Sequence, residues 1–582
     1  MPVLKKTCLP RYQWTLRESD SSRSEKKWKS IAGKLNCSPL LARVLVSRGI
    51  ETGDEAKTFL KPEPSQILPP ESIPGLEIAR DRLLKAASES EPVMVHGDYD
   101  ADGIIGAVIL HQTLKKLGCK SKIFLPSREI HGYGLAAEAV DSAVSAGIKL
   151  LVAVDCGVSS HETVKKARDC GIEVIIADHH ELPEFLPDGA IIAHPEIDGE
   201  YPGGKIAGAC VAFKLALALN KATGLDSDGF FEKYLPMVAV ATIADVCPLT
   251  GENRPIVALG LPKIPESKIP GLRILWQGSR RDDPEAVINE RDIAFGMAPI
   301  LNAAGRMGDP FIAAKLLLSK TEKSAWTILR DLQAINRERR KIQAETRHRL
   351  IKLPEVAFAG PDAGILVIVD ESSTPGLIGL AASGLVEETG RPTCVLSPGE
   401  DENGFLYRGS MRCAGGENLI ELMSPVKKHA EKMGGHAGAM GLTVRKEKIN
   451  DFIKACDSID WKPTPKVLEL DFHLDGSPSD NDEVNELDAT RPWGAGNPQP
   501  AFSWGPLDIK GSRIVGKTGE HIQVTLGGPD GNLFKGIGFS LSRFFPDDGG
   551  IGRSARAAGH FIINSWQGND SVEFQVLDIE FD

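Results

Sequence analysis

Residues 93–103 read Val-Met-Val-His-Gly-Asp-Tyr-Asp-Ala-Asp-Gly, an apolar run that breaks into three carboxylates at every second position. Residues two apart in an extended segment point to the same side, so Asp98, Asp100 and Asp102 are expected to crowd together. Without cations, their mutual repulsion would raise their pKa values and weaken the fold. The stretch therefore predicts a divalent-metal site, and the alternative is a polar turn that binds no metal.

A calcium loop of the EF-hand type also has acidic residues at its first, third and fifth positions, followed by glycine. The last loop position, counted from Asp98, is Ile109, where that motif requires a bidentate glutamate. The segment before the loop also has the pattern of a strand rather than a helix. The EF-hand interpretation therefore fails.

Length and composition bound the class of protein. The chain has 582 residues, a net charge of −11 and 10 cysteines, a length that suits about three or four domains. No apolar stretch could span a bilayer and no signal segment is visible, so we expect a cytoplasmic protein. The cysteines show no paired spacing, which argues against a zinc site or a disulfide framework. The acidic balance still leaves a local basic groove for nucleic acid open.

Apolar runs that alternate with helical stretches predict a multidomain α/β protein whose first sheet is parallel, with helices on both faces. We expect strands of this sheet at residues 93–96, 150–154, 174–177 and 191–193. Five segments are expected: an accessory region at 1–75, the parallel-sheet domain at 76–320, a connecting helix at 321–353, a second α/β domain at 354–460 and an all-β barrel at 461–582. The charged run Arg337–Lys341 favours a solvated connecting helix over a direct nucleic-acid contact.

Residues that can bind a metal follow the strands of the parallel sheet, whose carboxyl ends meet at one edge. They are His96, Asp98, Asp100 and Asp102 after the first strand, Asp155 after the second, and Asp178, His179 and His180 after the third. Asp245 lies in an apolar stretch, where a lone carboxylate is costly unless it is paired or bound to metal. One aspartate after a strand is usually a helix cap, and one histidine is usually a core residue, but their joint occurrence favours a metal centre.

The ligand set is rich in oxygen, includes imidazole and needs no thiolate, which suits Mn²⁺ or Mg²⁺ better than structural zinc. Two ions that share a bridging carboxylate would lie about 3.5 to 4 Å apart. Cys156 has no evident base partner and is interpreted as a small packing residue.

These residues resemble the motifs of the DHH phosphoesterase superfamily, which is named after the run Asp178-His179-His180. Within it, the chain is similar to the RecJ exonucleases, and the similarity extends over residues 96–103, 154–157, 177–180, 207–215, 242–254, 301–308, 409–412, 434–441 and 492–498. The resemblance implies a DHH domain, a DHHA1 domain and an OB-fold barrel. Short superfamily members such as nanoRNases, cyclic-dinucleotide phosphodiesterases and pyrophosphatases lack the barrel.

The resemblance also implies roles for single residues. It assigns one metal to His96, Asp100 and Asp155, and the other to Asp102, Asp155, His179 and Asp245, with Asp155 bridging. Asp98 and Asp178 become supporting residues, and His180 is expected to contact the scissile phosphate. The substrate is expected to contact Arg128, Ser410 and Arg412 at its 5′ end, and Arg306 and His436 elsewhere. Ser127, Met411, Cys413 and Thr374 depart from the family's usual residues, and these departures concern substrate binding rather than metal chemistry.

The expected function is a metal-dependent 5′ to 3′ exonuclease that hydrolyses single-stranded DNA to nucleoside monophosphates in DNA repair and recombination. The resemblance implies a monomer without membrane association, with a single-strand-binding protein and a RecQ-type helicase as partners. Trp493, Phe502 and Trp504 are candidates for stacking on bases and equally candidates for the core. The alternatives are a phosphodiesterase for short oligonucleotides or cyclic dinucleotides, which the chain length disfavours, and a non-catalytic DNA-binding scaffold, which the complete ligand set disfavours.

Overall fold

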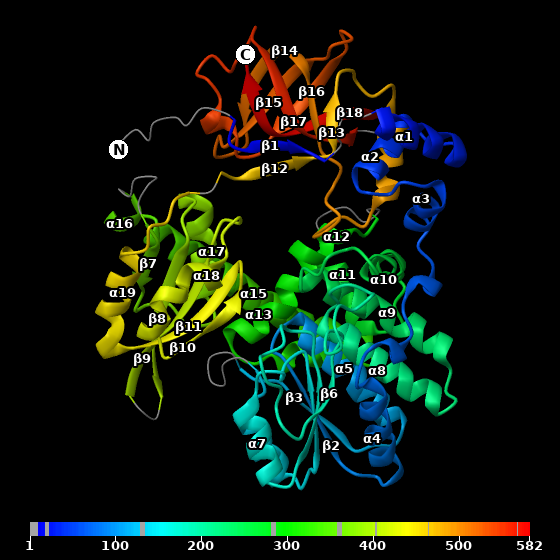
Figure 1. Cartoon of the computed structure of the whole chain (residues 1–582), viewed down its shortest axis with the longest axis vertical. Coiled ribbons are helices and arrows are strands. Elements are labelled where there is room, and N and C mark those ends of the chain that lie inside the picture. Colours follow the sequence, from blue (N-terminus) through cyan, green and yellow to red (C-terminus); the bar gives the residue numbers. More distant parts are fainter. Residues whose placement is uncertain are drawn as a thin grey trace. The chain divides into compact units, whose positions relative to one another are not determined.

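The parallel sheet expected around residues 93–103 is present in the computed structural model of the chain (Figure 1). All its strands run parallel in the order β3-β2-β4-β5-β6. Their bounds are β2 Val93–Gly97, β3 Ser121–Phe124, β4 Leu150–Val154, β5 Glu173–Ala177 and β6 Ile191–Ala193. Four of the strands confirm the prediction. The edge strand β3 was not predicted, because its four residues, Ser-Lys-Ile-Phe, do not form the continuous apolar run that marks a buried strand.

The structure describes residues 10–17, 22–127, 134–280, 287–357, 364–401, 404–463, 465–566 and 569–582. The chain divides into two units. The first combines Met1–Pro62 with Thr464–Trp493 and Pro498–Asp582, and the second comprises Glu63–Pro463 with Gly494–Asn497. The N-terminal residues therefore belong to the same unit as the C-terminal barrel. In the part of the chain that is described, no helix is both long and apolar enough to cross a membrane.

Helices cover both faces of the parallel sheet. Alternate strand residues enter two separate cores, with Val93 and Val95 in one and Met94 in the other, as the two-residue period of a strand dictates. The first core is completed by helices α4 (Leu76–Ser88), α5 (Ala101–Lys116), α8 (Gly208–Ala222) and α9 (Ser227–Ala244). The second core is completed by α6 (Ala137–Ser145) and α7 (His161–Asp169).

A helical layer follows in sequence and ends in a long helix. Its helices are α10 (Asn253–Gly260), α11 (Pro270–Ser279), α12 (Glu290–Asp292), α13 (Ala298–Met307), α14 (Phe311–Leu317) and α15 (Glu322–Leu350), with a π-helical turn, η4 (Ile293–Met297), between α12 and α13. Helix α15 confirms the predicted connecting helix. It is not solvated on all sides, because Arg339 is only 8% exposed.

The second α/β domain contains a mixed sheet of order β10-β11-β9-β8-β7. Only β7 and β8 are parallel in it. The strands are β7 (Leu366–Val369), β8 (Thr393–Asp401), β9 (Gly404–Arg412), β10 (Lys432–His436) and β11 (Ala439–Arg445). Helix α17 (Ile378–Thr389) packs on one face, and α18 (Leu419–Met423) and α19 (Ile449–Asp457) pack on the other. A short helix, α16 (Pro354–Ala357), precedes β7.

The C-terminal region is a closed five-stranded barrel, as predicted. Its strands follow the order β14-β15-β16-β18-β17 and close by pairing of β17 with β14. They are β14 (Phe502–Val515), β15 (His521–Gly527), β16 (Leu533–Gly538), β17 (Ser554–Trp566) and β18 (Asn569–Phe581), with β13 (Phe472–Leu474) added on β14 and a short helix, α20 (Asn481–Asn485), after β13. Phe502 and Trp504 are fully buried in its core. Their predicted alternative role in stacking on bases is therefore wrong, because neither ring can reach a nucleotide.

The N-terminal segment is fastened to this barrel by a strand and a buried carboxylate. Strand β1 (Gln13–Leu16) pairs in parallel with β12 (Val467–Leu470). Asp578 of β18 is fully buried and accepts hydrogen bonds from the backbone of Arg11 and Tyr12 and from the indole of Trp14, at 3.0, 3.1 and 2.9 Å. Helices α1 (Ser22–Leu35), α2 (Pro39–Ser47) and α3 (Gly53–Leu60) follow.

A buried ion pair between Arg48 and Asp471 joins α2 to the start of the barrel at 3.1 Å, with side chains 6% and 3% exposed. Asp471→Ala should lower the free energy of unfolding by about 3 to 5 kcal/mol, because it removes the carboxylate that balances the charge of the buried guanidinium. The matched control is Glu469→Ala, which removes the exposed partner of Arg17 and should cost about 0 to 1 kcal/mol. Urea unfolding of both variants measures the difference, and equal midpoints would contradict the prediction.

Candidate metal centre

The loop after β2 is held in place from both sides. Asp100 caps α5, and its Oδ1 accepts hydrogen bonds from the backbone N–H groups of Asp102 and Gly103 at 3.0 and 3.3 Å. The side chain of Asn302, on α13, accepts the N–H of Ala101 at 2.7 Å. Because both ends of the loop are bound, its carboxylates remain together at the carboxyl edge of the sheet.

Asp102 faces the start of α8 and is 1% exposed. Its two carboxylate oxygens accept the N–H groups of Gly208 and Ala209, each at 2.8 Å, and the helix dipole favours a negative charge there. Burial, followed by repulsion from Asp245, nevertheless raises the pKa of Asp102 to about 7. Without a cation, the Asp102 side chain therefore loses its proton only at a pH well above the usual range for aspartate.

Asp155 follows β4 with a left-handed backbone, at φ +61°, and is 2% exposed. Its Oδ1 lies 3.0 Å from Nε2 of His179. Both atoms are buried, and neither makes a hydrogen bond within the described residues. Buried polar atoms are rarely left in this state, and a metal ion bound by both side chains accounts for it. Burial, followed by the charge of Asp102, raises the pKa of Asp155 well above its usual value.

The run Asp178-His179-His180 sets the charge of its own histidines. Burial lowers the pKa of His179, which keeps the ring in the neutral form that a metal ligand needs. Burial also disfavours charge on His180, but the hydrogen bond that its Nδ1 makes to Asp178 at 2.7 Å outweighs this and raises the pKa of His180 to about 9. Asp178 further accepts the N–H of Val158 at 3.1 Å and so fixes this segment.

Asp245 completes the group from another direction, at the end of α9. Its Oδ2 accepts a hydrogen bond from Sγ of Cys247 at 3.2 Å. Burial, followed by repulsion from Asp100, raises the pKa of Asp245 to about 6. The next residue, Val246, has a left-handed backbone at φ +57°. Asp155 and Val246 are therefore both strained positions at the group of carboxylates.

Three overlapping groups of side chains place ligand atoms within 4.8 Å of one another. They are Asp98, Asp100 and Asp155; Asp102, His179 and Asp245; and Asp155, His179 and His180. The oxygen-rich set with imidazole suits Mn²⁺ or Mg²⁺, and the groups are linked by the shared residues Asp155 and His179. The donor set and the unbonded atoms of Asp155 and His179 therefore fit the binding of divalent metal.

His96 lies beside these groups but does not join them. It is fully buried. Its Nε2 accepts the N–H of Ala136 at 3.3 Å, and its Nδ1 lies 3.4 Å from Sγ of Cys156. The role of His96 as a metal ligand, which the family resemblance implies, stays a prediction, and Asp98 lies in one ligand group with Asp100 and Asp155.

The predicted substrate residues that the structure describes come from the mixed sheet and α13. Arg412 on β9 donates to Oγ of Ser410 at 2.9 Å. His436, at the end of β10, lies with its ring centroid 6.3 Å from that of His180 and its Nδ1 3.4 Å from a carboxylate oxygen of Glu181. Arg306 is on α13, the helix that also carries Asn302. Arg128 lies outside the described residues.

Sequence reasoning missed three groups that hold the site: the side chain of Asn302 and the N–H groups of Gly208 and Ala209. The available signal for the last two was a pair of small residues at the start of an apolar helical run. A Cβ on Gly208 would lie 2.5 Å from Oδ1 of Asp155, so only glycine allows α8 to approach this closely.

Comparison with known proteins gives three family-model matches: the DHH family N-terminal domain at residues 92–242, the DHHA1 domain at 362–459 and the RecJ OB domain at 470–578. The chain is similar to proteins named single-stranded-DNA-specific exonuclease RecJ. That of Bacillus subtilis is 31% identical over 97% of this chain and 70% of its own length. The protein of Salmonella typhimurium is 33% identical over 93% of this chain and 96% of its own length.

Among solved structures, the chain is similar to RecJ of Thermus thermophilus in complex with Mn²⁺, with a TM-score of 0.82 and 27% identity over 98% of this chain and 80% of the other. The complex of the same protein with Mg²⁺ gives a TM-score of 0.77, and the match covers 98% of this chain and 78% of the other.

Gly208→Ala should weaken Mn²⁺ binding by about 10- to 100-fold, the usual cost of disturbing groups that orient metal ligands. The physical reason is the collision of the added methyl group with Asp155. The matched control is Gly33→Ala on α1, where a Cβ meets no atom within 4 Å. Calorimetric titration with Mn²⁺ measures both variants, and wild-type affinity of the Gly208 variant would contradict the prediction.

The raised pKa values of Asp102 and Asp245 predict how stability depends on pH. Without metal, the folded protein binds more protons than the unfolded chain between roughly pH 4 and 7, so these groups stabilise the fold at low pH and lose that effect as the pH rises. Divalent ions compete with those protons.

The increase in melting temperature caused by Mn²⁺ should therefore be larger at about pH 8 than at about pH 5.5. Thermal unfolding in EDTA and in Mn²⁺ at both pH values measures it. Asp102→Asn should reduce the increase at both, while Asp141→Asn, at an exposed residue of α6, should not. An increase that is independent of pH would rule out this linkage.

Proposed function

Because this chain belongs to the RecJ family of the DHH phosphoesterases, we propose that it is a metal-dependent exonuclease that hydrolyses single-stranded DNA from the 5′ end. The products are nucleoside 5′-monophosphates. The observation that carries the proposal is the convergence of buried ligand atoms around Asp155, in a chain that also has the DHHA1 domain and the OB barrel of the family.

Two ligand groups would hold two divalent ions. Asp98, Asp100 and Asp155 form one, and Asp102, His179 and Asp245 form the other. Asp155 is within reach of both, because its Oδ1 lies 3.0 Å from His179. When bound, such ions lower the pKa of the attacking water and neutralise charge on the phosphate. The family resemblance adds His96, which is fully buried, as a further ligand of the first ion.

The chain's own residues supply the remaining charge. The hydrogen bond from His180 to Asp178 favours the charged form of the imidazole and raises its pKa to about 9. A charged imidazole with its other nitrogen directed away from Asp178 can donate to a phosphate oxygen, where charge develops during attack. His436 approaches this ring from the second α/β domain and would contact the same nucleotide.

Ser410 and Arg412 would bind the 5′-terminal phosphate. The guanidinium and hydroxyl lie together on β9, close to the start of α17, where a Cβ added to Gly379 would be 3.0 Å from Nη2 of Arg412. A guanidinium beside a helix start is a favourable place for a phosphate. Binding of the terminal phosphate there would set the direction of digestion. Arg306 and Arg128 would contact the strand further on.

The OB barrel would hold the trailing strand through exposed rings and basic residues. Phe539 is 54% exposed, and its ring lies 5.4 Å from that of His521, which makes this pair a better stacking candidate than the buried Phe502 and Trp504. We further propose a role in DNA repair and recombination in the cytoplasm, as a monomer that works with a single-strand-binding protein and a RecQ-type helicase.

A long oligodeoxynucleotide labelled at either end tests the proposal in the presence of Mn²⁺. A 5′ label should appear at once as a mononucleotide, whereas a 3′ label should appear in products that shorten gradually. Asp155→Asn should lower the rate by roughly 100-fold or more, because it removes the charge of a ligand in the first group that also lies 3.0 Å from His179 of the second. Asp141→Asn, an exposed carboxylate of the same domain, is the control. First release of the 3′ label would reverse the proposed direction, and an active Asp155 variant would refute the metal assignment.

A further inference from the structure

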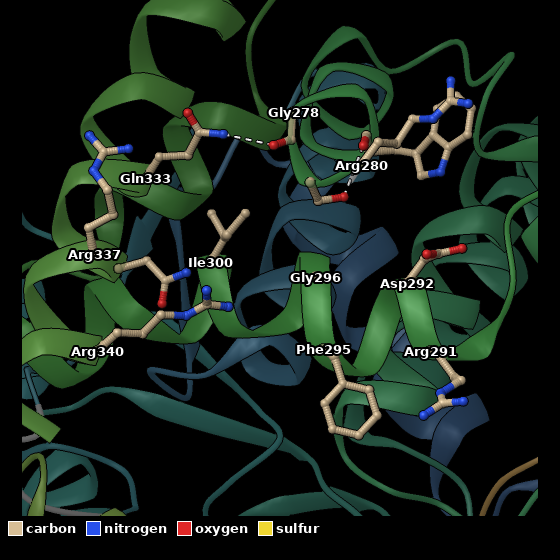
Figure 2. Close-up of a pocket in the computed structure, with 13 residues that line it drawn as sticks. Gly278, Arg280, Arg291, Asp292, Phe295, Gly296, Ile300, Gln333, Arg337 and Arg340 are labelled. Carbon is tan, nitrogen blue, oxygen red and sulfur yellow. Dashed lines mark hydrogen bonds between the residues drawn. The ribbon is translucent and has the colours of Figure 1, made fainter. Parts of the chain in front are cut away.

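A cavity of about 660 Å³ lies between α11, the π-helical turn η4 and α15. Among the described residues, four arginines line it, Arg280, Arg291, Arg337 and Arg340, and one carboxylate, that of Asp292. Figure 2 shows Arg337 and Arg340 on one side, Arg280 and Arg291 on the other, and Gly296 and Phe295 between them. In a chain with a net charge of −11, such an excess of positive charge marks an anion-binding site.

Three of these guanidinium groups are available to a ligand. Arg291, Arg337 and Arg340 are exposed, and they form no ion pair within the described residues. The carboxylate of Asp292 is already engaged, since it accepts the N–H of Asn289 at 2.9 Å as part of a helix cap. Within the described residues, the charge of these three guanidinium groups is therefore not paired with a carboxylate.

Aromatic surface accompanies the charge. Phe295 is 65% exposed and lies in η4, where the π-helical turn interrupts the regular helix, a feature that is frequent at functional sites. Trp276 forms part of the wall, and the guanidinium of Arg280 lies 4.5 Å from its ring centroid. Exposed guanidinium groups beside an open aromatic ring suit a ligand that carries both a phosphate and a flat ring.

The cavity is separate from the metal centre. On α13, Asn302 holds the metal-binding loop, whereas Ile300 lines the cavity. Two residues apart on a helix point about 200° away from each other, so α13 lies between the two sites. The wall is braced by the side chain of Gln333, which donates to the carbonyl of Gly278 at 2.8 Å and ties α15 to α11.

We propose that this cavity is a second nucleotide-binding site, in which Arg337 and Arg340 bind phosphate and Phe295 stacks on the base. The choice of a nucleotide over another anion rests on the proposed function, because an exonuclease releases mononucleotides and handles strands that contain the same unit. The ligand is therefore either a free mononucleotide or one nucleotide of a bound strand.

Equilibrium titrations of the full chain in EDTA test the proposal without relying on hydrolysis. The probes are thymidine monophosphate, inorganic phosphate and a thymidine oligonucleotide. The double variant Arg337→Ala/Arg340→Ala should bind the nucleotide about tenfold or more weakly, because each charge-assisted contact is lost. The matched control Lys323→Ala/Arg330→Ala removes two exposed charges of the same helix that do not line the cavity and should bind as the wild type does.

Phe295→Ala distinguishes a nucleotide from a simple anion. It should weaken binding of thymidine monophosphate but not of inorganic phosphate. Arginine-dependent binding of the mononucleotide identifies the free product as the ligand. If only the oligonucleotide shows binding that depends on Arg337 and Arg340, the ligand is one nucleotide of a bound strand.

Two results would overturn the proposal. One is nucleotide binding that the arginine variant leaves unchanged, and the other is inorganic phosphate that binds as tightly as the mononucleotide. Hydrolysis of a dinucleotide in Mn²⁺ should be equal in all variants and the wild type, which shows that the metal centre is intact. If the wild-type protein does not hydrolyse the dinucleotide in Mn²⁺, the proposed exonuclease function is contradicted, and the proposed second site is judged by the titrations alone.

Discussion

Repulsion among buried carboxylates is the constraint on which this structure depends. Asp102 and Asp155 are almost completely buried, and burial and mutual repulsion raise the pKa of each. Such an arrangement costs free energy unless a cation is bound. The surrounding fold is built to hold it nonetheless: the amide groups that begin α8 bind Asp102, and Asn302 holds the loop. Gly208 lets the helix approach Asp155 without a collision.

The rest of the second unit extends from that centre through α15. Arg349, near the end of this helix, forms two hydrogen bonds of 2.8 and 2.7 Å with the carboxylate of Asp370, which follows β7. The pKa of Asp370 is held well below its usual value despite burial, because Arg349 and two serines bind the charged form. One end of α15 thereby carries the second sheet, while its middle lines the arginine-rich cavity. Helix α15 therefore does more than connect two domains.

Much of the fold could be predicted from local sequence, and the exceptions have physical causes. The buried strands of the parallel sheet are continuous apolar runs, so β2, β4, β5 and β6 were found, whereas β3 is short and lies at the edge. The pairing of β1 with β12 joins residues more than four hundred positions apart, and no local pattern encodes it. The sequence around Phe502 and Trp504 does not distinguish a core residue from a base-stacking residue. Their burial is decided by the closure of the barrel.

The site was predicted to a similar depth. Asp100, Asp102, Asp155 and His179 converge because parallel strands bring their carboxyl ends to one edge, and Asp245 joins them from the end of α9. The contacts of His96 could not be predicted, since Ala136 and Cys156 approach its ring from elsewhere in the chain. The arginine-rich cavity was missed because its residues come from three elements, and the charged run on α15 favoured a solvated helix when read alone.

Anomalous scattering from crystals grown with Mn²⁺ would test the arrangement of the carboxylates most directly. Two peaks about 3.5 to 4 Å apart are expected, one against Asp98 and Asp100 and the other against Asp102, His179 and Asp245, with Asp155 between them. A single peak, or peaks that do not touch Asp155, would contradict the two-ion centre.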